Sequence, residues 1–178
     1  MGFLAFGRGV ERFVPPGKGL GHVLASSATA SRCPRRKGRG TLRLRSSSRA
    51  RDLASRRRLR VSDFLSGELG RRALRCSLRH DLVAVRLAPP ELELPRGGLV
   101  RLRCAETSRA ATVDLDDESL RRDYAERVAA WRESTEASLR RARVDLMDVP
   151  VPRVQTKEAI AGPILRFFRM RELRGAKR

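Results

Sequence analysis

Hydrophobic and polar residues recur with two distinct periods along the chain, and residues 61–88 show both. They contain the end of a strand, a turn at Ser62 and Asp63, an amphipathic helix over 68–79 and an apolar strand over 82–87. Apolar or small residues three and four apart predict the helix, and the second strand is apolar enough to be buried on both faces. This strand–helix–strand order predicts a right-handed crossover. Ligand sites in such folds lie beyond the carboxyl ends of strands, so Asp63 is the first candidate site residue.

The other segments divide in the same way. Residues 2–6 and 10–14 are predicted to be short strands, and residues 99–104 and 111–115 a hairpin. Asp116 or Asp117 is predicted to cap a long helix, followed by a strand over 144–149 and a helix over 157–172. The pattern predicts an α/β fold, a partial doubly wound sheet with a β-hairpin before a long helix. The inward stripe of the long helix is predicted to contain Leu120, Tyr124, Val128, Trp131, Thr135, Leu139 and Ala142.

Residues 25–60 depart from this pattern. They contain no Val, Ile, Met, Phe, Tyr or Trp, and they hold twelve Arg and one Lys against Asp52 alone. This composition is typical of disordered or nucleic-acid-binding segments. Residues 59–61 should nevertheless end a central strand, although burying an unpaired guanidinium costs several kcal/mol. The predicted organisation is N-terminal strands over 1–24, an irregular or disordered segment over 25–60, the main α/β part over 61–173 and a basic tail over 174–178.

The charge of the chain favours one function class. With 40 Lys and Arg against 20 Asp and Glu, the net charge is +20, so nucleic acid could bind by neutralisation of its phosphates. Residues 25–60 contain no aromatic residue that could stack on a base, so such binding would be non-specific. The candidate contacts are Arg35, Arg36, Lys37, Arg39, Arg56, Arg57 and Arg58.

Several other classes are disfavoured. The three cysteines are odd in number and widely spaced, which indicates a reducing compartment rather than a disulfide framework. No apolar run is long enough to cross a bilayer, so we expect a cytoplasmic protein without membrane insertion. In the glycine-rich residues 15–22, Lys18 is followed by Gly19 and not by the Ser or Thr of a Walker A motif. No catalytic triad or nucleophile elbow is present, and we expect no enzyme activity.

The order of several motifs resembles a bacterial family. FGRGVERFVPPGKGLGHVL, SDFLSG, RHDLVAVRL, PPELELPRGGLVRL, VDLMDV and ILRFFRMRE follow the order seen in the domain of unknown function fifty-eight family. The resemblance covers residues 2–24 and 61–173. It implies a von Willebrand factor A-like, doubly wound fold and a role in protein interaction. It also implies a MoxR-type AAA+ ATPase as partner.

The resemblance further implies a metal-ion-dependent adhesion site, which binds Mg²⁺ in intact relatives. Its third loop would be Ser62 and Asp63, and its second-loop threonine would be Thr41. The first loop, Asp-x-Ser-x-Ser, has no counterpart, and Leu42 stands where the family usually has Asp. One Thr and one Asp cannot replace a five-oxygen site, so we expect an incomplete site, no strong metal binding and no cofactor. Asp63 could instead act as a turn residue that caps the following helix.

These departures suggest one hypothesis. Reading a GC-rich gene in a wrong frame produces runs of Arg, Ser and Ala, so the chain would be a truncated and partly frame-shifted family member. Two function classes follow. The first is a non-catalytic von Willebrand A-like interaction module, and the second is a basic nucleic-acid-binding protein that uses residues 25–60.

Overall fold

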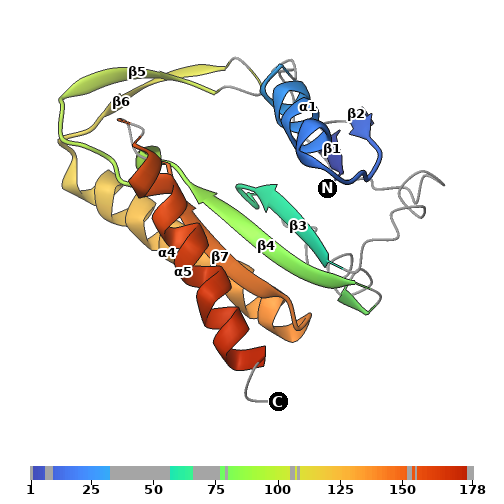
Figure 1. The fold of residues 1–178 in the computed structure, drawn as a ribbon. Coiled ribbons are helices and arrows are strands. Elements are labelled where there is room, and N and C mark those ends of the chain that lie inside the picture. The colour runs from blue at the N-terminus through green and yellow to red at the C-terminus, as the bar shows by residue number, and fades with distance from the viewer. Residues whose placement is uncertain are drawn as a thin grey trace. The chain divides into compact units, whose positions relative to one another are not determined.

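The computed structural model describes residues 2–6, 10–32, 57–65, 77–78, 80–104, 107, 109–151, 154 and 156–175. The chain divides into two compact units, and Figure 1 labels their helices and strands. Unit 1 consists of Met1–Ser55 and Arg101–Val113, and unit 2 of Arg56–Val100 and Asp114–Arg178. The chain passes between the units at three points, so neither unit is a continuous segment.

Unit 2 is built on a parallel three-stranded sheet with the order β3-β4-β7. The strands are β3 (Arg57–Ser62), β4 (Asp81–Ala88) and β7 (Asp145–Pro150). In the register, Val61 pairs with Val85, and Val85 pairs with Met147. β4 lies in the centre because five consecutive residues, 82–86, are buried in it. The sequence predicted this buried strand correctly.

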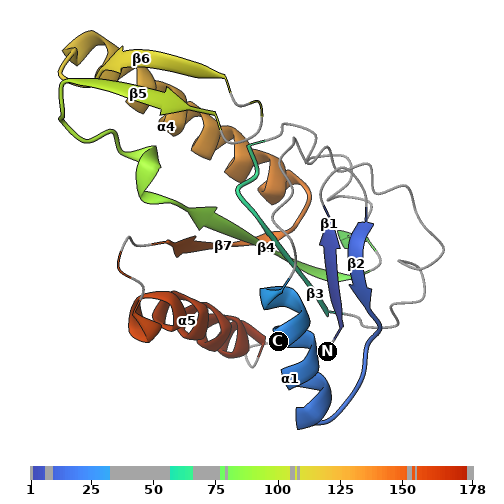
Figure 2. The same cartoon turned by 90° about the horizontal axis from the view of Figure 1, so that it is seen from above.

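Two helices cover the two faces of the sheet (Figure 2). α4 (Glu118–Arg141) packs through Leu139 against Leu82 and Ala84, in a cluster that also contains Phe64. On the other face, α5 (Lys157–Gly175) packs through Ile160, Ile164, Phe167 and Phe168 against Val83, Val85, Met147 and Val149. This helix–sheet–helix arrangement confirms the predicted α/β fold class.

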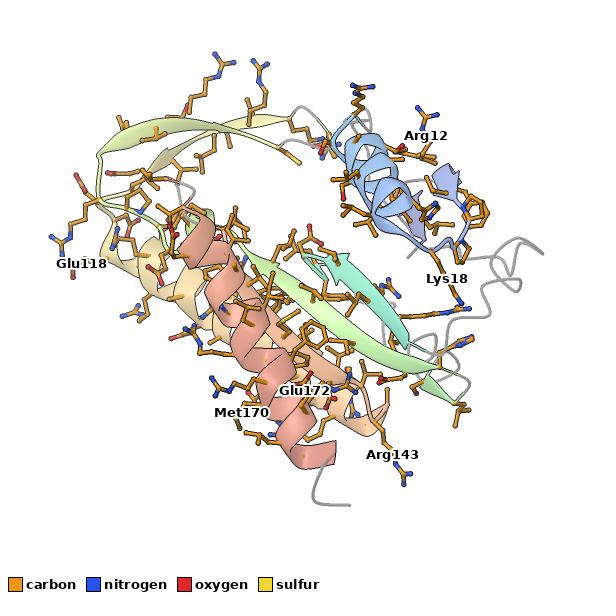
Figure 3. The ribbon with its side chains drawn as sticks, viewed as in Figure 1. Arg12, Lys18, Glu118, Arg143, Met170 and Glu172 are labelled. Atoms are coloured by element: carbon orange, nitrogen blue, oxygen red, sulfur yellow. The ribbon has the colours of Figure 1, made fainter. Side chains whose placement is uncertain are left out.

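The long helix α4 has charges at its ends that suit its dipole. Figure 3 shows Glu118 in its first turn and Arg143 just beyond its last turn. A negative charge at the N-terminus and a positive charge at the C-terminus each stabilise a helix. The predicted stripe lies on its less exposed face: Thr135 and Leu139 are buried in the helix and Ala142 just beyond it, whereas Leu120, Tyr124, Val128 and Trp131 are half-buried.

The sequence predicted that residues 59–61 end a central strand, which is not the position of β3 among the described strands. In the sheet formed by the described residues, β3 lies at an edge, and Leu59 and Val61 are 54% and 51% exposed. The arginines that alternate with these two residues, Arg58 and Arg60, are half-buried, and their Nε atoms are buried. β4 contains the longer run of residues that can be buried, and it therefore takes the central position.

In unit 1, β1 (Phe3–Phe6) pairs antiparallel with β2 (Val10–Val14), and α1 (Leu20–Ser31) follows. The two strands were predicted, and the helix runs across residue 24, where the sequence placed a boundary. Alanine is the best helix former, and this helix contains three of them without a long apolar stripe. At the other boundary, residues 57–60 belong to β3. The rest of the predicted irregular segment, residues 33–56, lies outside the described residues.

A hairpin precedes α4, as predicted. β5 (Leu99–Arg103) and β6 (Ala110–Asp114) form a two-stranded sheet, and most of their residues are exposed. A short 3-10 helix (Pro90–Leu92) precedes it. The predicted helix over 68–79 falls mainly outside the described residues. Among the helices in the described part of the chain, none is both long and apolar enough to cross a membrane.

Candidate functional site

The loop after β3 lies at the carboxyl end of a parallel strand, where the sequence placed Asp63. The Ser62 hydroxyl accepts a hydrogen bond from the Phe64 amide at 3.2 Å. The Asp63 Oδ1 atom accepts one from the Leu65 amide at 3.2 Å and one from the Ser62 hydroxyl at 3.4 Å. Aspartate and serine commonly close turns in this way. We call residues 62–65 the interaction loop, and in it the Asp63 and Leu65 side chains are exposed.

The buried side chain of Phe64 anchors the interaction loop to the apolar core. Its side chain is 2% exposed and lies in the apolar cluster with Leu139. Its backbone has a positive φ of 58°, a conformation that costs a bulky residue about 1–2 kcal/mol. The Trp131 Nε1 atom donates a hydrogen bond to the Phe64 carbonyl at 3.1 Å, and the Arg60 guanidinium lies 5.8 Å from the Phe64 ring centroid. The surroundings thus hold a conformation that the residue would otherwise avoid.

Arg86 connects Trp131 to acidic residues of β7 and α4. The residue is 3% exposed, and its guanidinium lies 5.4 Å from the Trp131 ring centroid. Its Nε and Nη2 atoms donate to the two carboxylate oxygens of Asp148 at 2.5 and 2.8 Å. Nη2 also donates to Glu136 at 2.9 Å and Nη1 to the Arg132 carbonyl at 3.4 Å. The hydrogen bond to Asp148 raises the pKa of Arg86, so the buried group stays charged.

The predicted site residues fall in different places. Ser62 and Asp63 meet in the interaction loop, whereas Thr41 lies outside the described residues. Arg57 and Arg58, two of the predicted nucleic-acid contacts, belong to the strand β3. The remaining predicted nucleic-acid contacts, Arg35, Arg36, Lys37, Arg39 and Arg56, also lie outside the described residues.

Sequence reasoning missed Trp131 and Arg86 as parts of the site. Trp131 was assigned to the core face of the long helix, and only its indole N–H distinguishes it from the other residues of that stripe. The signal for Arg86 was an arginine inside a strand that is otherwise apolar. Its partners Glu136 and Asp148 are 50 and 62 residues further along the chain, so sequence spacing could not identify them.

The described residues do not fit the Mg²⁺ site that the resemblance implies. Ser62 and Asp63 offer one hydroxyl and one carboxylate from a single loop, and the Asp63 Oδ1 atom already accepts two hydrogen bonds. The neighbouring strands β4 and β7 have their carboxyl ends at the same end of the sheet. They end at Ala88 and Pro150, whose side chains carry no oxygen. Mg²⁺ requires oxygen ligands in near-octahedral geometry. Within the described ranges, no group of three or more His, Cys, Asp or Glu residues could hold a metal ion.

Carboxylates at the opposite end of the sheet are bound by a single arginine. Arg171 of α5 contacts Asp81 at 2.6 Å and Asp145 at 2.8 Å, at the first residues of β4 and β7. The hydrogen bond to Asp81 raises the pKa of Arg171. This cluster joins α5 to two strands, so we assign it a structural role.

Residues 1–134 match the model of a family described as "Protein of unknown function DUF58". The chain belongs to the DUF58 family. The matched part includes residues 25–60, the interaction loop, Arg86 and Trp131, and it ends within α4. In this DUF58 chain, Glu136 and Asp148 therefore lie beyond the matched residues. No curated protein and no solved structure matches the chain.

Proposed function

We propose that the chain is a non-catalytic, von Willebrand A-like protein-interaction module and that its contact site is the interaction loop. One observation carries the proposal. An exposed carboxylate at Asp63 and a leucine that is 62% exposed at Leu65 lie on either side of a buried anchor, Phe64. Because the loop is already fixed, binding through these two side chains would cost little ordering of the loop.

The contacts of the loop support a role without catalysis. In the described part of the chain, Phe64 is contacted by an arginine, a tryptophan and apolar core residues. Beside Asp63, the Ser62 hydroxyl donates to the carboxylate, and we propose that this pair closes the turn rather than catalyses a reaction. In this proposal the Asp63 carboxylate binds a basic group of the partner directly, with Leu65 in an apolar contact beside it.

The resemblance points to a MoxR-type AAA+ ATPase as the partner. The test uses a purified ATPase of this type, captured by the immobilised full-length chain at moderate salt. Asp63→Asn should lower capture about tenfold, because a hydrogen bond between charged groups contributes about 1.5–3 kcal/mol. Asn retains a side-chain oxygen that can accept the Leu65 amide hydrogen bond, so the loop should keep its shape.

The matched control is Asp123→Asn, which makes the same change of charge at an exposed position of α4. It should capture the ATPase as well as the wild type does. Capture should also persist in EDTA, because no metal bridges the contact. Equal capture by Asp63→Asn and wild type would refute the loop as the contact site. No capture by the wild type would refute the ATPase as partner.

Charge supports a second candidate, non-specific nucleic-acid binding by residues 25–60. The net charge of +20 and the concentration of arginines in this segment are the observations that favour it. Affinity for a random-sequence RNA should then fall about 10³-fold or more between roughly 50 and 200 mM salt. Replacing residues 33–56 by a Gly-Ser linker should abolish binding, and Asp63→Asn should leave it unchanged. Retained binding in the linker variant would exclude this candidate.

A further inference from the structure

We propose that Arg86 and Trp131 are positioning residues that hold the interaction loop in the single conformation presented to a partner. The last step of this inference, presentation to a partner, rests on the proposed function. The preceding steps concern only the contacts between β4, α4, β7 and the loop.

The loop needs such support because its anchor is strained. Phe64 has a φ of 58°, which side-chain burial alone does not fix, since a ring can remain buried while the peptide on either side rotates. The hydrogen bond from the Trp131 indole reaches the Phe64 carbonyl at 3.1 Å and thereby fixes the peptide plane between Phe64 and Leu65. That plane determines where the Leu65 amide points, and this amide is the one that binds Asp63 Oδ1.

The indole in turn needs a fixed orientation. The Arg86 guanidinium lies over its face at 5.4 Å from the ring centroid, a geometry in which a cation attracts the aromatic face. The guanidinium cannot rotate freely, because Asp148 binds it through two parallel hydrogen bonds and Glu136 binds a third N–H. Bidentate pairs of this kind fix orientation as well as adding energy. The direction of the indole N–H is therefore set by groups on β4, β7 and α4.

The fold itself does not require an arginine at this position. Burying an ion pair is costly, and apolar residues of similar volume are often equally stable in its place. The four residues that precede Arg86 in β4 show that an apolar core forms here. The partners of Arg86 are half-exposed, with side-chain exposures of 50% for Asp148 and 43% for Glu136. Water can hydrate both carboxylates if the arginine is removed, so its loss does not leave buried charges behind.

The test combines two variants with a readout that needs no partner. Trp131→Phe removes the N–H donor but keeps an aromatic ring, and Arg86→Met removes the charge but keeps an apolar chain of similar length. Amide hydrogen exchange at Phe64 and Leu65 should accelerate about three- to tenfold in both variants, the effect of losing one ordinary hydrogen bond. Exchange in the ladder between β4 and β7 should not change. Arg127→Met, at an exposed position of α4, is the matched control and should behave as the wild type.

Capture of the ATPase then tests the final step. It should fall in Trp131→Phe and Arg86→Met in proportion to the faster exchange and stay constant in Arg127→Met. Unchanged exchange at Phe64 and Leu65 in Trp131→Phe would overturn the proposal, and so would faster exchange of the whole sheet to the same degree. Faster loop exchange with full capture would refute presentation to the partner. If the wild type captures no ATPase, the proposed function fails, while the exchange data still decide whether these two residues position the loop.

Discussion

Two adjacent carboxylates, Asp116 and Asp117, accept hydrogen bonds from different backbone segments at the start of α4. Asp117 is the N-cap, and its Oδ1 accepts hydrogen bonds from the Ser119 amide at 2.8 Å and the Leu120 amide at 3.2 Å. Asp116 instead accepts the amides of Gly97 and Gly98, each at 3.1 Å. The sequence indicated that one of the two caps the helix, but it could not decide which. The partners of Asp116 lie 19 and 18 residues earlier in the chain, so sequence spacing did not reveal them.

The N-cap predicts a dependence of stability on pH. The hydrogen bond from the Ser119 hydroxyl, followed by those from the Leu120 and Ser119 amides, lowers the pKa of Asp117. A lowered folded-state pKa means that the unfolded chain takes up the proton first. The contribution of Asp117 is therefore complete above the ordinary carboxyl pKa of about 3.9 and is lost as the pH falls through the folded value.

Asp117→Asn keeps an acceptor at the N-cap and removes this titration. In urea unfolding followed by circular dichroism, the stability of the wild type should fall more steeply than that of the variant below about pH 4. At neutral pH the two should differ little, because Asn and Asp are comparable N-caps. Parallel curves for the two proteins across the acid range would contradict this account.

The two helices that cover the sheet differ in how much of their surface is apolar and buried. Leu139 of α4 is 1% exposed, whereas Leu165 of α5 is 68% exposed. In α5, the residues three and four apart from Ile160 to Phe168 face the sheet, and Leu165 lies outside that row. The same residue type therefore occurs at a core position and at a solvent position of this one unit.

This contrast predicts two very different effects of the same substitution. Leu139→Ala should lower the free energy of unfolding by about 2–5 kcal/mol, because it leaves a cavity between α4 and the sheet. Leu165→Ala should change it by no more than about 0.5 kcal/mol. Chemical denaturation monitored by Trp131 fluorescence measures both. Similar losses for the two variants would show that α4 does not pack as described.

The elements of the two units were predictable to different degrees. β4, the stripe of α4 and the inward residues of α5 were predicted because burial determines where apolar residues recur in each element. This pattern can be read from the order of residue types alone. The edge position of β3 was not, because strand order depends on contacts that are distant in sequence. α1 was missed because its Ala and Ser residues carry no amphipathic signal. In the candidate site, Asp63 was predicted from its place after a strand, whereas Phe64 was missed because its φ of 58° is a property of the backbone.

At the scale of the whole molecule, the two units differ in how much they bury. All the buried hydrophobic residues identified in the described part of the chain belong to unit 2. Among the side chains of unit 1 that the structure describes, the one that is buried is Ser26, a polar residue. Apolar burial is the main source of stability, so we expect unit 1 to unfold before unit 2.

Thermal unfolding can separate the units, because Trp131 is the one tryptophan of the chain and lies in unit 2. Its fluorescence reports unit 2 alone, whereas far-ultraviolet circular dichroism reports the helices of both units. The dichroism signal should begin to change at a lower temperature than the fluorescence. Coincident transitions would indicate one cooperative structure and would refute independent unfolding of unit 1.

The central position of β4 also has a consequence for the time course of synthesis. Arg86 and Asp148, which β4 and β7 bring together, are separated by 62 residues. At about 5–20 residues per second, the ribosome needs several seconds after β4 emerges to complete β7 and then α5. During those seconds β4, which has five consecutive buried residues in the folded chain, lacks its neighbour β7 and the helix α5. Exposed strands of this kind aggregate readily, so production of the intact chain should depend on chaperones that bind nascent polypeptides.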